Sequence, residues 1–254
     1  MKLMKLEDFF LENKRVALGF SGGVDSSFLL WAALRCGAEV RAYYVSSAFQ
    51  PAFEREDALR LARSLGVEPV ILELDILSCD EVTANPPDRC YHCKKRIFGA
   101  VSRQALADGY TVLIDGTNAS DDAADRPGMR ALKELSVLSP LRLCGLTKAE
   151  IRRRSREAGL FTWDKPAYAC LATRTPSGEK ITGRILQRTE AAETSLHELG
   201  FQDLRVRHRG EDAFLEVSEK EKNLLFEKWD QIEDLLKKSG YRDAFVNMIW
   251  RNPG

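Results

Sequence analysis

A glycine- and serine-rich segment between two apolar runs most constrains how this chain can fold. Residues 21–27 (SGGVDSS) directly follow the apolar run 16–20 and directly precede the apolar run 28–33. Gly22 and Gly23 permit positive φ and a close approach of the backbone to a ligand. The N–H groups that open a helix, with the helix dipole behind them, attract an anion. The segment therefore predicts a buried strand, a tight turn and a helix that together bind phosphate, and an ordinary strand-to-helix turn is the weaker interpretation.

The first 145 residues alternate short apolar runs with amphipathic segments. We expect strands at residues 16–20, 39–45, 69–74 and 111–115, and helices from the glycine-rich segment to about residue 35 and over 53–65. This alternation predicts an α/β fold with a parallel sheet covered by helices on both faces. Ligands of such sheets bind beyond the carboxyl ends of the strands, where residues 21–27 and the segment Gly116-Thr117-Asn118 both fall.

The rest of the chain has a different pattern. Thr147 followed by Glu150 is a capping box that predicts a helix to about residue 159, and a polar loop follows over 163–181. We expect a helix at 184–199, two paired strands at 204–208 and 213–217, and a helix near 219–238. The prediction is a small α+β domain, residues 179–254, after a first domain of residues 1–178.

Composition limits the functional classes. Lys plus Arg and Asp plus Glu number 38 each, so no basic field points to nucleic acid. No apolar run approaches the roughly 20 residues of a membrane span, and the amino terminus lacks the pattern of a signal peptide. We expect a cytoplasmic enzyme that acts on a small molecule, without nucleic-acid or membrane partners. Six cysteines in such a protein indicate thiols or metal ligands rather than disulfides.

A second polar segment, residues 115–122 (DGTNASDD), ends the last expected strand of the first sheet. Gly116 would allow a ligand to come close, and Asp121 or Asp122 could hold Mg²⁺ against phosphate oxygens. On this segment alone, a solvated turn is an equally good interpretation. The first segment is not a Walker loop, because no Gly-Lys-Ser/Thr follows it.

The cysteines fall into two groups. Cys90 and Cys93 form a CxxC pair at an expected helix start beside basic residues, which predicts lowered thiol pKa values. Cys170 lies in a separate loop, and Arg174 follows four residues later. A CxxC pair alone is compatible with a redox pair, half a zinc site or two ligands of an iron–sulfur cluster. Three cysteines from two loops could hold a [4Fe–4S] cluster with one open iron, or be unrelated thiols. The remaining cysteines have the pattern of small buried hydrophobes: Cys36, Cys79 and Cys144.

Arg205 and Arg207 alternate on one expected strand, so both point to the same face. Paired guanidinium groups are suited to bind a phosphate, although a solvated cationic strand has the same pattern. Glu190, Glu193 and Glu216 could orient these arginines, but their pattern is more typical of exposed charges.

The motifs SGGVDSS, NPPDRCYHCKKRIF, DGTNASDDAADRPGMRALKELSVLSPL, LTKAEIR, DKPAYACLATR and LRVRHRGEDAFLEV resemble, in this order, those of the LarE family of ATP-dependent sulfur transferases. The resemblance covers nearly the whole chain. It implies a PP-loop ATP pyrophosphatase domain (adenine nucleotide alpha hydrolase-like), ATP and Mg²⁺ as cofactors, and a homo-oligomer. It also implies adenylation of a carboxylate of pyridinium-3,5-biscarboxylic acid mononucleotide and its conversion to a thiocarboxylic acid for the nickel-pincer nucleotide of lactate racemase. The residues that the resemblance and the segments above assign to ATP are Ser21, Gly22, Gly23, Asp25, Ser26, Ser27, Gly116, Thr117, Asn118 and Arg174.

In this family the cysteine of the ACLA segment, here Cys170, handles the sulfur. In the sacrificial version it gives up its own sulfur and becomes dehydroalanine. Cys90 and Cys93 resemble the subset in which three cysteines bind a [4Fe–4S] cluster, and we favour that version here. Arg205 and Arg207 match the segment for the substrate phosphate. The alternatives are a tRNA thiolation enzyme of the same superfamily, an ammonia-using synthetase and a nucleotide-binding module without turnover.

Overall fold

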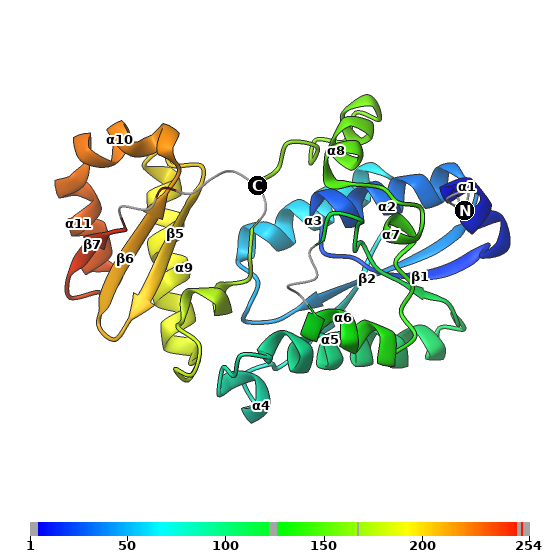
Figure 1. Ribbon diagram of the computed structural model, residues 1–254, viewed down its shortest axis with the longest axis horizontal. Helices are drawn as coiled ribbons and strands as arrows, with labels where there is room; N and C mark the ends of the chain where they lie inside the picture. Colours follow the sequence, from blue (N-terminus) through cyan, green and yellow to red (C-terminus); the bar gives the residue numbers. More distant parts are fainter. Residues whose placement is uncertain (1–4, 122–125, 167, 248–249, 251–254) are drawn as a thin grey trace. The chain divides into compact units, whose positions relative to one another are not determined.

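The computed structural model describes residues 5–121, 126–166, 168–247 and 250 (Figure 1). The chain divides into two compact units, one of residues 1–76 and 88–165 and the other of residues 77–87 and 166–254. This division falls before the predicted domain boundary after residue 178. The reason is that residues 171–174 pack against the helix and strand that follow them.

The first unit has a four-stranded sheet in the order β3-β2-β1-β4, in which every pair of neighbouring strands is parallel. The strands are β1 (Arg15–Gly19), β2 (Glu39–Ser46), β3 (Val70–Glu73) and β4 (Leu113–Ile114). The predicted parallel α/β sheet is thus confirmed, and β4 is shorter than expected. Apolar residues fill the central strand β1 because both of its faces are covered.

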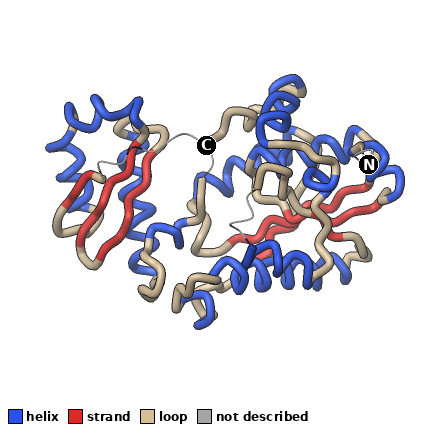
Figure 2. Tube along the Cα trace, viewed as in Figure 1, coloured by secondary structure: helices blue, strands red, loops and turns tan. Residues whose placement is uncertain are grey.

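Helices cover both faces of this sheet (Figures 1 and 2). Val16 and Leu18 belong to the core on one face, and the intervening Ala17 belongs to the core on the other, as the alternation of a strand requires. The first core is completed by α1 (Leu6–Glu12), α2 (Val24–Arg35), α3 (Ala52–Ser64), α7 (Pro140–Leu143) and α8 (Lys148–Glu157). The second is completed by α5 (Arg89–Ala107) and α6 (Arg126–Glu134).

The second unit has a three-stranded sheet in the order β5-β6-β7. β5 (Leu204–Arg209) and β6 (Asp212–Val217) are antiparallel, as predicted, and β7 (Ala244–Val246), which was not predicted, runs parallel to β6. One face of the sheet packs on α9 (Gly183–Glu198) and α11 (Trp229–Lys238). The remaining pieces are α4 (Asp80–Thr83), the 3-10 turns η2 (Leu171–Arg174) and η3 (Glu219–Glu221), and α10 (Lys222–Glu227).

The single helix expected near residues 219–238 is divided into η3, α10 and α11. The break between α10 and α11 is at Lys228, whose φ of −106° and ψ of 16° leave helical geometry. The ammonium group of Lys228 donates to the Leu199 carbonyl at 3.0 Å. This tertiary hydrogen bond lies at the break, and a local sequence pattern does not reveal it.

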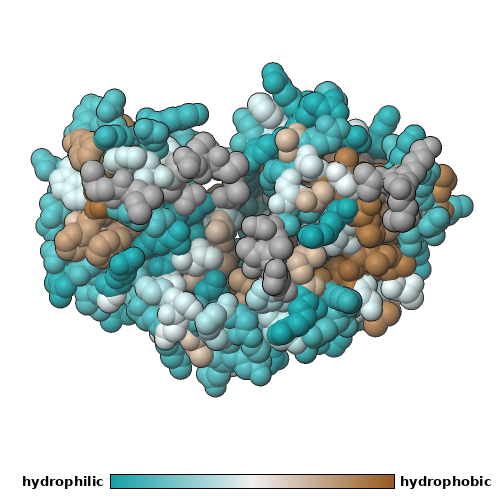
Figure 3. Space-filling model, in the orientation of Figure 1, coloured by the Kyte–Doolittle hydropathy of each residue, from teal (hydrophilic) through white to brown (hydrophobic). Residues whose placement is uncertain are grey.

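Hydrophilic residues cover most of the face in Figure 3, with scattered apolar areas between them. In the part of the chain that the structure describes, no helix has both the length and the apolar character needed to cross a membrane.

Candidate nucleotide and sulfur-transfer sites

The glycine-rich segment forms a tight turn between β1 and α2. Gly22 has a φ of 73°, in the left-handed region, and Gly23 is the N-cap residue of α2. A Cβ atom on Gly22 would lie 2.4 Å from the Cβ of Ala58 on α3, so no larger residue fits there. Ser26 Oγ contacts the Gly23 carbonyl at 3.2 Å and the Ser21 amide at 3.3 Å, which closes the turn on itself. The result is a cradle of backbone groups at the start of a twelve-residue helix.

The second predicted segment touches the first. A Cβ atom on Gly116 would lie 2.9 Å from the Ser26 amide nitrogen, so glycine is required where the two loops meet. Gly116 follows β4, which is hydrogen-bonded to β1, so both loops lie at the carboxyl ends of neighbouring strands. The sequence-based expectation that these two segments share an edge of the sheet is confirmed.

Side-chain hydrogen bonds hold the second loop in shape. Asn118 is buried, and its backbone and side-chain nitrogens donate to the Asp121 carboxylate at 2.7 and 3.1 Å. Thr117 and Ser139 donate to Asp115, whose pKa is raised by burial. Asp122, the other candidate for Mg²⁺, lies outside the described residues.

Lys148 joins these two loops, and the sequence reasoning missed it. Its ammonium group pairs with Asp25 Oδ2 at 2.6 Å, and its amide donates to Ser120 Oγ at 3.0 Å. Burial raises the pKa of Asp25, and the charge of Lys148 opposes that shift. Thr147, the predicted cap, does accept from the Glu150 amide, which places Lys148 in the first turn of α8. The available signal was its place directly after the cap in the LTKAEIR motif.

The described residues of the first unit fit a nucleotide phosphate chain and its metal. The cradle presents N–H groups and a helix N-terminus, and Lys148 adds a cation beside them. Asp25 Oδ1 is buried and has no hydrogen-bond partner among the described residues, which suits a carboxylate oxygen that binds Mg²⁺. Ser27, another predicted phosphate ligand, is fully buried, and its hydroxyl has no hydrogen-bond partner among the described residues.

Cys90 and Cys93 lie in the first turns of α5, where the sequence placed them. Cys90 is exposed and Cys93 half-buried. Between them, Tyr91 donates to Glu134 on α6 at 2.8 Å and lies under the Arg130 guanidinium, 3.8 Å from the ring centroid. These contacts fix the start of α5 against α6.

Cys170, half-buried, belongs to the second unit, as the residue that precedes η2. Within the described ranges, no three His, Cys, Asp or Glu side chains form a group that could hold a metal ion. The Cys170 carbonyl accepts from the amide and hydroxyl of Thr173, at 3.0 and 2.8 Å. Arg174, a predicted ATP contact, is buried in this unit and pairs with Glu193 at 2.8 Å.

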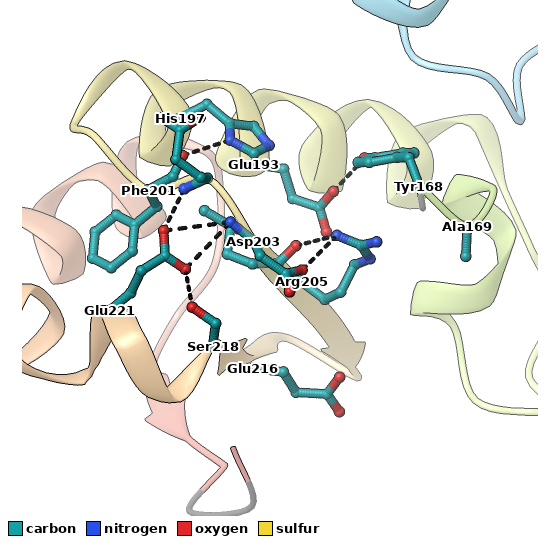
Figure 4. Close-up of polar contacts among 12 residues, drawn as sticks. Tyr168, Ala169, Glu193, His197, Phe201, Asp203, Arg205, Glu216, Ser218 and Glu221 are labelled. Carbon is teal, nitrogen blue, oxygen red and sulfur yellow. Dashed lines mark hydrogen bonds and ion pairs between the residues drawn. The ribbon is translucent and has the colours of Figure 1, made fainter. Parts of the chain in front are cut away.

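Arg205 and Arg207 both point away from the core of the second unit, but their surroundings differ. Arg205 is only 3% exposed and lies over the ring of Tyr168 (Figure 4), 4.8 Å from its centroid. Arg207 is half-buried, pairs with Glu216 at 2.9 Å and donates to the Thr173 carbonyl at 2.6 Å. Glu216 therefore orients Arg207. The interpretation of Glu193 as an exposed charge was wrong, because it is 2% exposed.

Comparison with known proteins places the chain in a family, although no protein-family model matches it. The pyridinium-3,5-bisthiocarboxylic acid mononucleotide synthase of Lactiplantibacillus plantarum is 32% identical over 92% of this chain and 86% of its own length. The chain belongs to the LarE family. An uncharacterized protein of Synechocystis is 38% identical over 85% of the chain and 81% of its own length.

This LarE-family chain also has more distant relatives that match a smaller part of it. The tRNA-specific 2-thiouridylase MnmA of a Thermotoga species is 27% identical over 59% of the chain and 54% of its own length. With the parallel sheet and its glycine-rich turn, this similarity identifies the PP-loop ATPase fold.

Proposed function

We propose that this protein is an ATP-dependent sulfur transferase that converts a carboxylate of pyridinium-3,5-biscarboxylic acid mononucleotide to a thiocarboxylic acid. AMP and pyrophosphate are the other products, and the thiolated nucleotide serves the synthesis of the nickel-pincer nucleotide. The observation that carries the proposal is the meeting of the glycine cradle, Asp25 and Lys148 in a chain related to a synthase of the bisthiocarboxylic acid.

In the first step the chain activates the carboxylate. A carboxylate is a poor electrophile because oxide is a poor leaving group, so its oxygen first attacks the α-phosphorus of ATP. The bond between the α-phosphorus and the bridging oxygen breaks, and pyrophosphate leaves with the electron pair. The N–H groups of the cradle and the Lys148 ammonium bind the β- and γ-phosphates. Asp25 would hold Mg²⁺, which supplies further neutralisation of the phosphate charge.

In the second step sulfur replaces the activated oxygen. The Cys170 thiolate attacks the acyl carbon, the bond to the AMP oxygen breaks, and AMP leaves. The thioester is then released when a base removes the Cα proton of residue 170 and the Cβ–Sγ bond breaks. This elimination leaves dehydroalanine in the chain and a thiocarboxylate on the substrate. Arg205 and Arg207 bind the substrate phosphate in this scheme, and the Arg207 guanidinium is the more accessible of the two.

A variant of the second step follows from the resemblance of Cys90, Cys93 and Cys170 to the cluster-binding subset of the family, although the described residues bring no three such side chains together. Thiolates are the ligands of [4Fe–4S] clusters, and Cys90 and Cys93 lie three residues apart on one side of α5. We propose that they and Cys170 hold such a cluster. With these three residues as its ligands, the cluster would supply hydrosulfide as the sulfur source, so that Cys170 would not be consumed.

The test is turnover of anaerobically purified protein with ATP and the biscarboxylic acid mononucleotide. We expect AMP, pyrophosphate and thiocarboxylate in equal amounts from the wild type and from Cys144→Ala, a matched half-buried cysteine. Cys170→Ala should release pyrophosphate but form no thiocarboxylate. Failure of the wild type to release pyrophosphate with this substrate overturns the proposal. Product formation by Cys170→Ala with ammonia indicates an ammonia-using synthetase, and turnover that requires tRNA indicates a thiolation enzyme like the MnmA relatives.

Iron and sulfide analysis of the same preparation separates the two sulfur sources. A cluster predicts iron, acid-labile sulfide and visible absorption that Cys90→Ala abolishes. The sacrificial route predicts iron-free active protein and a loss of one H₂S from the Cys170 peptide after turnover. Iron-free protein with multiple turnovers would overturn both versions.

A further inference from the structure

We propose that Glu193 is a positioning residue that holds the Cys170 segment and the arginine strand β5 in a fixed arrangement. The inference rests on the proposed function, because it assigns the sulfur donor to one of these segments and the substrate phosphate to the other. All of the residues concerned belong to the second unit.

Glu193 is a buried carboxylate that accepts hydrogen bonds from three residues. It lies on α9, where only 2% of it is exposed. Its Oε1 accepts from Arg174 Nε at 2.8 Å and from the Val206 amide at 2.8 Å. Its Oε2 accepts from an Arg174 terminal nitrogen at 3.0 Å. The same oxygen accepts from the Tyr168 hydroxyl, and Figure 4 shows this bond. A burial this complete is acceptable for a carboxylate only because each oxygen has two donors.

On one side the network determines the path of the Cys170 segment. Arg174 spans it by donating to the carbonyls of Ala169 at 2.9 Å and Cys170 at 3.4 Å. Tyr168, two residues before the cysteine, is held by its own bond to Glu193. The segment is therefore attached to Glu193 both before and after Cys170.

On the other side the network determines the position of the arginines. The Val206 amide, which donates to Glu193, lies between Arg205 and Arg207 on β5. Because β5 is an edge strand among the described strands, this N–H has no partner from those strands on that side, and the carboxylate satisfies it. The Arg205 and Arg174 guanidinium groups lie 4.8 and 4.7 Å from the Tyr168 ring centroid. A single carboxylate thus connects the donor segment to the phosphate-binding strand.

The charge of Glu193 has a role that an apolar residue cannot fill. A buried ion pair contributes little net stability compared with well-packed hydrophobic residues. The ion pair instead fixes the positions of its neighbours, because only an ionised carboxylate can accept hydrogen bonds from Arg174, Tyr168 and Val206 together. Burial and the Glu193 charge both raise the pKa of Tyr168, so its hydroxyl keeps the proton that it donates.

The test uses Glu193→Gln, and Glu198→Gln as a matched control from the exposed end of the same helix. Hydrogen exchange of the full chain without ligands should show faster exchange in both 166–174 and 204–209 for Glu193→Gln and in neither for the control. In the turnover assay we expect the KM for the mononucleotide to rise at least tenfold and kcat to fall at least tenfold. The Kd for ATP should stay unchanged, and Glu193→Asp should restore part of the loss.

A double variant separates positioning from stability. Glu193→Leu with Arg174→Leu removes both charges, so we expect thermal stability near that of the wild type but sulfur transfer as low as in Glu193→Gln. Recovery of transfer in this apolar pair overturns the positioning role, because packing alone would then suffice. Faster exchange in only one segment, or in neither, overturns it as well.

The outcomes distinguish this inference from the proposed function. A wild-type protein that releases no pyrophosphate with the substrate contradicts the proposed reaction, whereas the exchange data still decide whether Glu193 connects the two segments. Normal turnover by Glu193→Gln, with an active wild type, contradicts the inference alone.

Discussion

The two units organise their candidate sites by opposite means. In the first unit, backbone forms the phosphate cradle, and glycines at positions 22 and 116 provide the room. In the second unit, buried charged side chains form the network, and Glu193 and Arg174 are its centre. A backbone cradle depends on a few short-range contacts and is visible in a short motif. A side-chain network depends on residues far apart in the sequence, so losing one member leaves the other charges buried and unpaired.

The largest expected effect is on the side-chain network. Arg174→Met leaves the Glu193 carboxylate buried without its main partner, and breaking a buried pair in this way costs about 3–5 kcal/mol of stability. Urea unfolding followed by hydrogen exchange in residues 183–217 measures the loss. Arg242→Met, which breaks an exposed pair with Asp212 in the same unit, should change stability little. Equal losses for the two variants would contradict the importance assigned to burial.

The second-largest expected effect comes from a substitution in the glycine cradle. Gly22→Ala adds a left-handed alanine, about 1–2 kcal/mol, and an overlap with Ala58, about 1–3 kcal/mol. Gly37→Ala is the matched control, since Gly37 also has a φ of 73° but has nothing near its Cβ position. We expect calorimetry to show ATP binding abolished in Gly22→Ala and unchanged in Gly37→Ala. Retained ATP binding in Gly22→Ala would show that the turn is not the nucleotide site.

A smaller effect is confined to acid pH and to the second unit. Burial lowers the pKa of His208, Glu179 opposes the shift, and Arg188 adds to it, with Glu211 as the other nearby charge. The folded state therefore binds fewer protons than the unfolded state, and stability falls as the pH drops below the ordinary histidine pKa of about 6.5. His208→Gln should flatten this dependence in urea titrations. A steeper fall in the variant would reverse the assigned sign.

The smallest expected effect is the loss of stability when one helix cap is removed from either unit. Thr147 and Thr182 each accept from a backbone amide at 3.3 Å at the start of α8 and α9. Replacing either by alanine should cost about 1 kcal/mol. Hydrogen exchange should localise the Thr147→Ala loss to the first unit and the Thr182→Ala loss to the second. A loss of exchange protection spread evenly over both units in either variant would show that the units unfold together.

The sequence was sufficient for features whose causes are local. Apolar runs and glycine turns predicted β1 to β3, α2 and α3 to within a few residues, and the rule on strand ends brought residues 21–27 and Gly116 together. It was insufficient where the partner is distant. Asp25 and Lys148 are 123 positions apart, and the partners of Glu193, among them Arg174 and Val206, lie outside its helix. Only the packing of η2 and β5 on α9 makes Glu193 a buried residue.

The hydrogen bond from Val206 to Glu193 has a consequence for the solubility of the chain. A strand edge that is left uncovered is a template on which another chain can add a strand, and β5 is an edge strand of its sheet against which α9 and η2 pack. By occupying an N–H group in the middle of β5, the carboxylate blocks a position that an incoming strand would need. Substitutions at Glu193 should therefore favour aggregation through this edge, and selection for solubility would retain the carboxylate independently of any catalytic step.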